Sequence, residues 1–107
     1  MVKIKWHDNA QRLLDEHIRY ASIEFGKSTA LRWKREIKAF EERVNIFPES
    51  YPPEELLKDE PIKYRYRHLM NRRFKLIHHY DEVEDTVQVM DIWDTKMNPK
   101  TLIQRIK

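Results

Sequence analysis

Basic residues are concentrated in one part of this sequence, and their spacing suits phosphate binding. Residues 62–80 contain no Asp or Glu but carry six basic side chains: Lys63, Arg65, Arg67, Arg72, Arg73 and Lys75. The whole chain has 21 Lys and Arg against 18 Asp and Glu, so its net charge of +3 is gathered here. Clustered positive charge points to an anionic partner. Lys and Arg on an exposed sheet face can also simply maintain solubility and protect an edge strand.

Two strands joined by a tight turn are predicted to position these side chains. Apolar or aromatic residues alternate with basic ones in 62–69 and again in 74–80, and the polar segment 70–73 separates the two runs. We expect the basic side chains of both strands to lie on one face: Lys63, Arg65, Arg67 and Lys75. Arg72 and Arg73 would lie at the turn. These cations are suited to holding a phosphate, or the extra negative charge of a phosphorane.

Three further side chains in this stretch have suitable chemistry. His79 is expected on the same face as Lys75, where it could act as acid or base because its ordinary pKa is near ~6.5. Tyr66 and Tyr80 could stack on a nucleic-acid base. His78 and His79 do not form a metal pair, since neighbours on a strand point to opposite faces. No metal or cofactor motif is present.

The remaining elements follow from periodicity and capping residues. Residues 2–6 alternate as a short strand, and two helices are predicted at 9–25 and 29–46, capped by Asp8 and Ser28 and separated by the single glycine, Gly26. A proline-rich acidic loop, 47–61, with one possible helical turn at 54–58, leads to the basic strands. Thr86 opens a last strand, 86–93, that is apolar on both faces and therefore central. Val87 and Val89 are expected on one face of it, with Met90 and Ile92 on the other.

This order predicts an α+β fold in one domain spanning 1–107. The N-terminal strand is followed by an antiparallel two-helix hairpin. A three-stranded antiparallel meander then completes one sheet, and a short helical tail starts at Asn98-Pro99. Asp91 and Asp94, at the end of the last strand, are expected to cap the turn that follows rather than to act as a catalytic pair.

Composition narrows the function further. The chain has no cysteine, which excludes disulfides, thiolate nucleophiles and Cys-ligated zinc, and fits the cytoplasm. No apolar run is long enough for a signal peptide or a membrane span. A cytoplasmic protein without a membrane partner is the expectation.

The order of elements and three motifs resemble the RelE/ParE toxin superfamily, also called plasmid stabilisation proteins. The motifs are YRHL at 66–69, FKLIHHY at 74–80 and VMDIWDTKMNP at 89–99. The resemblance implies the toxin of a type II toxin–antitoxin pair, neutralised by a cognate antitoxin. RelE-like members cut mRNA at the ribosome without a metal, whereas ParE-like members poison DNA gyrase.

If the chain is a RelE-like endoribonuclease, a base must take the proton of the 2′-hydroxyl, cations must stabilise the phosphorane and an acid must protonate the leaving oxygen. The catalytic candidates are then Arg67, Arg65, Lys75 and His79. The nucleic-acid contacts would be Lys63, Arg72, Arg73, Tyr66 and Tyr80. RelE-type nucleases usually carry a His or Tyr near the C-terminus, and residues 102–107 contain neither. Inhibition of translation by metal-independent mRNA cleavage at the ribosome is the first functional expectation. The missing His or Tyr favours the first alternative, a gyrase poison, and a degenerate member that only binds its antitoxin is the second alternative.

Overall fold

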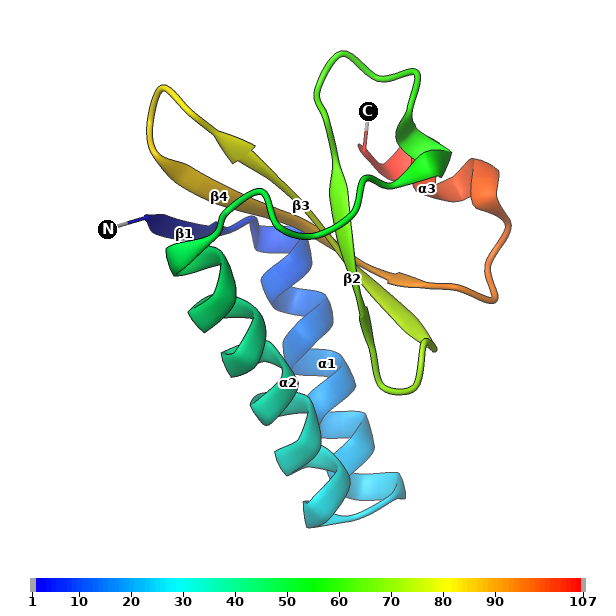
Figure 1. Cartoon of the computed structure of the whole chain (residues 1–107). Helices are drawn as coiled ribbons and strands as arrows, with labels where there is room; N and C mark the ends of the chain where they lie inside the picture. The colour runs from blue at the N-terminus through cyan, green and yellow to red at the C-terminus, as the bar shows by residue number, and fades with distance from the viewer. Residues whose placement is uncertain (1, 107) are drawn as a thin grey trace.

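The computed structural model describes residues 2–106 and contains one mixed sheet covered by helices (Figure 1). Its elements are β1 (Lys3–Trp6), α1 (Asp8–Glu24), α2 (Lys27–Ile46), the 3-10 turn η1 (Glu55–Leu57), β2 (Arg65–Leu69), β3 (Phe74–Asp81), β4 (Thr86–Asp94) and α3 (Pro99–Ile106). The strand order is β1-β4-β3-β2, with β1 parallel to β4 and the other neighbours antiparallel. The predicted α+β architecture, including the central position of β4, is confirmed.

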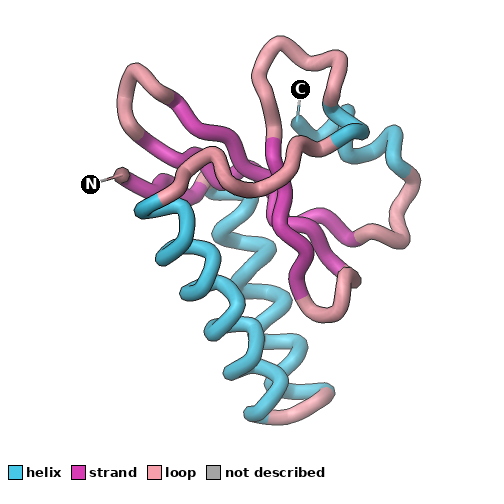
Figure 2. Tube along the Cα trace, in the orientation of Figure 1, coloured by secondary structure: helices cyan, strands magenta, loops and turns pink. Residues whose placement is uncertain are grey.

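Two apolar clusters pack on the two faces of the sheet. Figure 2 shows the strands of this sheet together with the helices that pack on it. The larger one joins α1 and α2 to one face through residues such as Leu14, Phe40 and Leu76. The smaller one lies on the opposite face, where Trp93 and Leu102 bring α3 against β4 and η1. Apolar side chains of β3 and β4 therefore enter both clusters: Leu76 and Val89 point into the larger one, and Ile77 and Trp93 into the smaller one.

Helix boundaries differ from the prediction by one or two residues. His7 rather than Asp8 is the N-cap of α1, and its side chain makes no capping hydrogen bond. Gly26 adopts a φ of 98°, the left-handed region that glycine enters without strain, and it ends α1 and caps α2 at once. This immediate reversal starts α2 at Lys27, so Ser28 lies inside the helix and is not its cap.

A bulge corrects the predicted faces of the last strand. The pairing of β3 with β4 shifts between Ile77 and His78, so that Met90 is an extra residue on β4. Val87, Val89 and Ile92 therefore all face the helices, and Met90 packs in the cluster under α3. The prediction that Ile92 would share a face with Met90 is wrong, because strict alternation holds only in an unbulged strand.

The strand predicted from residue 62 begins at Arg65. Before it, the loop folds back along the edge of β2: the amide of Glu54 donates to the carbonyl of Tyr64, and the amide of Tyr66 donates to that of Pro52. The helical turn expected at 54–58 is η1, and the amide of Leu56 within it donates to the Glu54 carboxylate. Asn98 caps α3 as predicted, with its side-chain oxygen accepting from the Lys100 amide at 3.0 Å.

Candidate functional site

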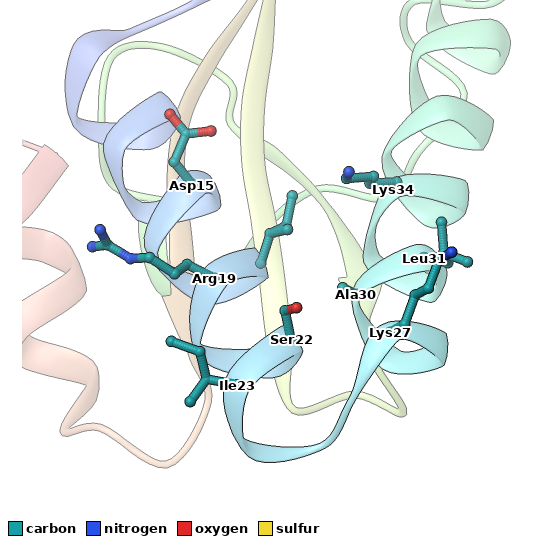
Figure 3. Close-up of a pocket in the computed structure, with 9 residues that line it drawn as sticks. Asp15, Arg19, Ser22, Ile23, Lys27, Ala30, Leu31 and Lys34 are labelled. Carbon is teal, nitrogen blue, oxygen red and sulfur yellow. The ribbon is translucent and has the colours of Figure 1, made fainter.

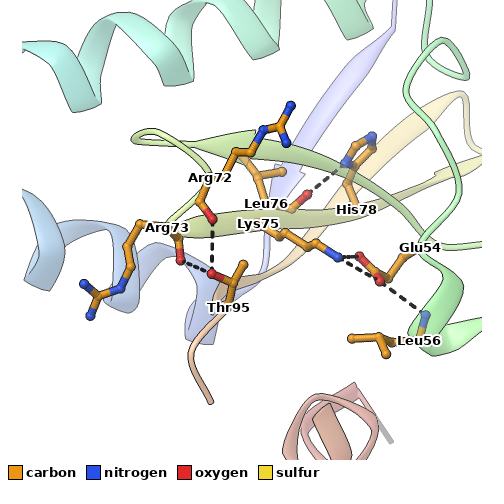
Figure 4. A network of polar contacts seen from close by, with 8 residues as sticks. All are labelled: Glu54, Leu56, Arg72, Arg73, Lys75, Leu76, His78 and Thr95. Carbon is orange, nitrogen blue, oxygen red and sulfur yellow. Dashed lines mark hydrogen bonds and ion pairs between the residues drawn. The ribbon is translucent and has the colours of Figure 1, made fainter. Parts of the chain in front are cut away.

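The register of the β2–β3 hairpin divides the basic residues between the two faces of the sheet. Arg65 pairs with His78 and Arg67 with Leu76, whereas Lys75 pairs with His68. Directly paired residues share a face, so Arg65 and Arg67 face the helices and Lys75 lies on the opposite side. Figure 4 shows Lys75 and His78 leaving β3 in opposite directions. The prediction of one continuous basic face is therefore wrong.

On the helix side, both arginines are held by the protein itself. Arg65 donates to the main-chain carbonyl of Tyr51 at 2.7 Å. Arg67 donates to the carbonyl of Glu36, in α2, at 3.1 Å, and to the Tyr51 hydroxyl at 3.4 Å. A third guanidinium, that of Arg43, lies 4.2 Å from the centre of the Tyr51 ring. These arginines tie the loop before η1 and helix α2 to the edge strand.

On the opposite face, Lys75 belongs to a small polar cluster. Its ammonium lies 2.9 Å and 3.1 Å from the two carboxylate oxygens of Glu54, which is almost fully buried (Figure 4). The same ammonium lies 4.5 Å from the centre of the Tyr66 ring, and His68 meets Tyr66 edge-on. Glu54, Tyr66, His68 and Lys75 form what we call the Glu54 cluster. It contains a carboxylate, an ammonium, an imidazole and a phenol, the groups used in proton transfer.

The turn residues and Lys63 are the most exposed of the predicted cations. Met70, Asn71 and Arg72 all have positive φ, and the side chain of Thr95 donates to the carbonyls of Arg72 and Arg73 (Figure 4). Arg73 forms an ion pair with Asp94 at 3.2 Å, which raises the pKa of Arg73 and lowers that of Asp94. Asp94 also caps the following turn through the Lys96 amide, as predicted.

His79 and Tyr80 do not join the arginines. His79 shares the face of Lys75, as predicted, but it lies further along β3, edge-on against Tyr64, and burial lowers its pKa. The Tyr80 hydroxyl donates to Asp85 at 2.5 Å, and this hydrogen bond raises the pKa of Tyr80 to about 12. His78 is buried between Phe40 and Tyr51, and desolvation lowers its pKa to about 4. It is a core residue.

Asp91 does not have the predicted role of capping the turn after β4. It is buried under α3, where it forms an ion pair with Arg105 at 2.5 Å, and burial raises its pKa although Arg105 opposes this effect. It therefore anchors α3 instead of capping the turn after β4. Its Oδ2 atom has no hydrogen-bond partner in the described part of the chain. No group of three or more metal-ligating side chains occurs among residues 2–106, and no described helix is long and apolar enough to span a membrane.

Sequence reasoning missed Glu54, His68 and Arg43. Glu54 is one of several acids in a proline-rich loop, and only its contact with Lys75, 21 positions away, distinguishes it. The position of His68 could have been predicted, since it alternates with the arginines in β2 and therefore lies on the opposite face. One face of the sheet therefore carries arginines that hold the fold together, and the other face carries the Glu54 cluster. The two groups do not meet in a single site.

Comparison with known proteins agrees with this fold. A sequence profile described as the ParE toxin of the type II toxin–antitoxin system parDE matches residues 4–99. Among solved structures, a chain of the chromosomal ParDE toxin–antitoxin system from P. aeruginosa superposes with a TM-score of 0.65 at 17% identity, covering 88% of this chain and 96% of that one. At that identity the likeness concerns the fold alone. No curated protein matches. Because the profile spans nearly the whole chain, this protein belongs to the ParE toxin family of type II toxin–antitoxin systems.

Proposed function

We propose that this toxin acts by binding DNA gyrase, in the manner implied by its resemblance to ParE-like proteins, and that a cognate antitoxin neutralises it. The observation that carries the proposal is the division of the predicted catalytic cations. Arg65 and Arg67 donate to main-chain carbonyls on one face, and Lys75 is paired with a buried carboxylate on the other. Metal-free RNA cleavage needs a base, cations and an acid converging on one phosphate.

Apolar side chains at the free end of the helix hairpin support binding to a protein. The side chains of Tyr20, Ile23 and Phe25 are 59%, 74% and 66% exposed. These three residues lie close together in the sequence, at the end of α1. Exposed apolar groups gathered in one place typically mark a protein interface. Figure 1 shows this end of α1 and α2 extending beyond the sheet. The hairpin end is therefore the surface that we assign to the target.

The test is brief induction of the toxin alone in a bacterium, followed by two parallel maps. One records DNA breaks trapped by gyrase, and the other records new RNA 5′ ends. We expect gyrase-linked breaks to accumulate while mRNA remains intact. New ends confined to translated regions, without DNA breaks, would show that the toxin is a ribosome-dependent nuclease. Absence of both signals together with normal growth would identify a member that only binds its antitoxin.

RNA cleavage is the second candidate, and the Glu54 cluster is the observation in its favour. Lys75, Tyr66 and His68 lie together on the face away from the helix hairpin, and His68 is only half-buried. Under this alternative His68 and Lys75 would contact RNA, together with Lys63 and Arg72. His68→Gln would then abolish growth inhibition, whereas under the gyrase proposal it leaves growth inhibition unchanged.

A further inference from the structure

A shallow groove runs between α1 and α2 on the outer side of the hairpin (Figure 3). Its volume is about 520 Å³, and its apolar lining comes from Ile18, Ile23, Ala30 and Leu31. Figure 3 shows Ser22 and Ala30 facing each other across it, two small residues that let the helices approach. Ile23 and Leu31, which are largely exposed, form its sides near the free end of the hairpin.

The charges along this groove are mostly positive and unpaired. Arg19, Lys27 and Lys34 line it, and within residues 2–106 none of the three forms an ion pair or a side-chain hydrogen bond. Figure 3 shows Lys34 reaching from α2 towards α1, while Arg19 extends from α1 on the side away from α2. Asp15 is the single acid in the lining, and it accepts a hydrogen bond from Gln11.

The position of Lys27 does not stabilise the fold. Lys27 is the first residue of α2, whose first turn contains no acid. A positive charge at a helix N-terminus opposes the helix dipole and is unfavourable there. By contrast, most cations of the β2–β3 hairpin are already bound to other groups of the protein. Exposed cations without an ion pair among the described residues also occur elsewhere, such as Lys5 and Lys58, but Arg19, Lys27 and Lys34 gather along one groove.

We propose that this groove docks an acidic amphipathic helix on the surface of the toxin's target. Apolar residues of such a helix would pack on Ile23 and Leu31, and its carboxylates would meet the three cations. A second copy of this chain does not fit, because two grooves facing each other would place their cations together. We assign the groove to the target and not the antitoxin, because it lies at the projecting end of the hairpin, which can enter a recess of a larger partner. The inference rests on the proposed function only in requiring a protein target.

The test compares two triple charge reversals with the same change in net charge. The groove variant is Arg19→Glu, Lys27→Glu, Lys34→Glu, and the control variant is Lys5→Glu, Lys58→Glu, Lys100→Glu, three exposed residues away from the groove. Thermal unfolding establishes that both fold. Lys27→Glu places an acid at the start of α2, which favours the helix. We expect the groove variant alone to lose growth inhibition while it still co-purifies with its cognate antitoxin.

A synthetic peptide measures the chemistry of the groove directly. The probe is an amphipathic helix with Leu on one face and Glu on the other, and the control peptide has Lys in place of Glu. We expect the wild-type chain and the control variant to bind only the Glu peptide, more weakly as salt is raised. The groove variant should bind it about tenfold more weakly or worse, since rim charges govern association.

Three results would overturn the inference: equal peptide binding by both variants, full growth inhibition by the groove variant, or loss of its antitoxin binding. The last would assign the groove to the antitoxin. Failure of the gyrase proposal can be distinguished from failure of the groove assignment. If the wild-type toxin produces no gyrase-linked breaks but its growth inhibition still depends on the groove, the target is a protein other than gyrase and the groove assignment stands.

Discussion

At the scale of single residues, the Lys75–Glu54 pair shows that a basic residue counted in the sequence can be neutralised by a partner in the folded protein. The Glu54 carboxylate is 1% exposed, so its charge is stabilised almost entirely by the Lys75 ammonium and by the Leu56 amide, which donates at 3.2 Å. A buried ion pair contributes little compared with an apolar pair, but removing one partner leaves an uncompensated charge.

We predict that Lys75→Met lowers the free energy of unfolding by about 3 kcal/mol, because the buried Glu54 carboxylate loses its counter-ion. The double variant Glu54→Gln, Lys75→Met should regain most of that loss, since the amide keeps an acceptor for the Leu56 amide without a charge. Urea unfolding of the three chains checks this. If the double variant is as unstable as the single one, Lys75 stabilises the fold by packing and not by charge.

His78 predicts an acid-sensitive fold. Its pKa is about 4 in the folded chain, because burial disfavours the charged ring, against ~6.5 in the unfolded chain. The unfolded chain therefore binds the proton more readily between these values. The stability associated with a neutral His78 is complete above pH ~6.5 and falls by about 1.4 kcal/mol per pH unit towards pH 4.

Urea unfolding between pH 4 and pH 7 measures this dependence. Burial also lowers the pKa of His17, His68 and His79, so these residues add to the slope in the same direction. The informative quantity is the difference between the wild-type chain and His78→Gln, which cannot take up the proton. We expect a clearly shallower slope for His78→Gln, and parallel slopes would contradict the assignment.

At the scale of elements, the β2–β3 turn combines strain with exposed charge. Met70, Asn71 and Arg72 have φ values of 52°, 56° and 67°, a left-handed run that costs ~1 kcal/mol for each ordinary L-residue. Thr95 holds the turn by donating to main-chain carbonyls, so the contacts survive replacement of the Arg72 side chain. The turn thereby brings the segment after β4 against the β2–β3 hairpin.

We predict that Arg72→Gly raises the free energy of unfolding by about 0.5–1 kcal/mol, because glycine adopts the positive φ without strain. Arg72→Ala is the matched variant: it removes the same charge but retains the Cβ atom, so it should not stabilise the chain. Growth inhibition should be unchanged in both if gyrase is the target. Reduced growth inhibition in both would favour RNA contact at this turn.

An ion pair anchors helix α3 to the sheet. Asp91 and Arg105 form a 2.5 Å ion pair beneath it, beside the buried Leu102. Arg105→Met leaves the Asp91 carboxylate buried and unpaired. We predict faster hydrogen exchange of the α3 amides in this variant, and restored protection when Asp91→Asn is added. Uniform acceleration over the whole chain would contradict a local anchoring role.

At the scale of the whole molecule, apolar side chains are exposed at both ends of the helix hairpin, and only one end is assigned to the target. Tyr20 and Phe25 lie at the free end, where their ring centroids are 6.0 Å apart, whereas Ile46 and Phe47 lie where α2 leads into the loop. All four are 59–67% exposed, so none contributes greatly to the core. Replacing either pair should therefore affect stability similarly, so the pair Ile46 and Phe47 is a control for the pair Tyr20 and Phe25.

We predict that Tyr20→Ser, Phe25→Ser abolishes growth inhibition, whereas Ile46→Ser, Phe47→Ser leaves it intact. Each replacement of an exposed side chain should change stability by less than about 0.5 kcal/mol, because little buried area is lost. Growth curves after induction, with thermal unfolding of the purified chains, test this. Equal growth inhibition by the two variants would remove the free end of the hairpin from the proposed interface.

Much of the fold was determined by the sequence itself, because local chemistry fixes local structure. Apolar spacing of 3 and 4 residues places the helices, Gly26 alone permits the reversal between them, and Asn98-Pro99 starts α3. Even the division of the basic residues was determined locally. A four-residue turn at 70–73 pairs odd-numbered residues of β2 with even-numbered residues of β3, which separates Arg67 from Lys75.

The state of the charged groups was decided only by the tertiary structure. Nothing local shows that Glu54, among the acids of its loop, is the buried partner of Lys75, that Tyr51 receives Arg65 and Arg67, or that Met90 is an extra residue on β4. These outcomes depend on how a loop and a helix far apart in sequence pack against the sheet edge. A side chain's type gives its charge, but whether that charge is free for a partner depends on the neighbours that folding brings to it.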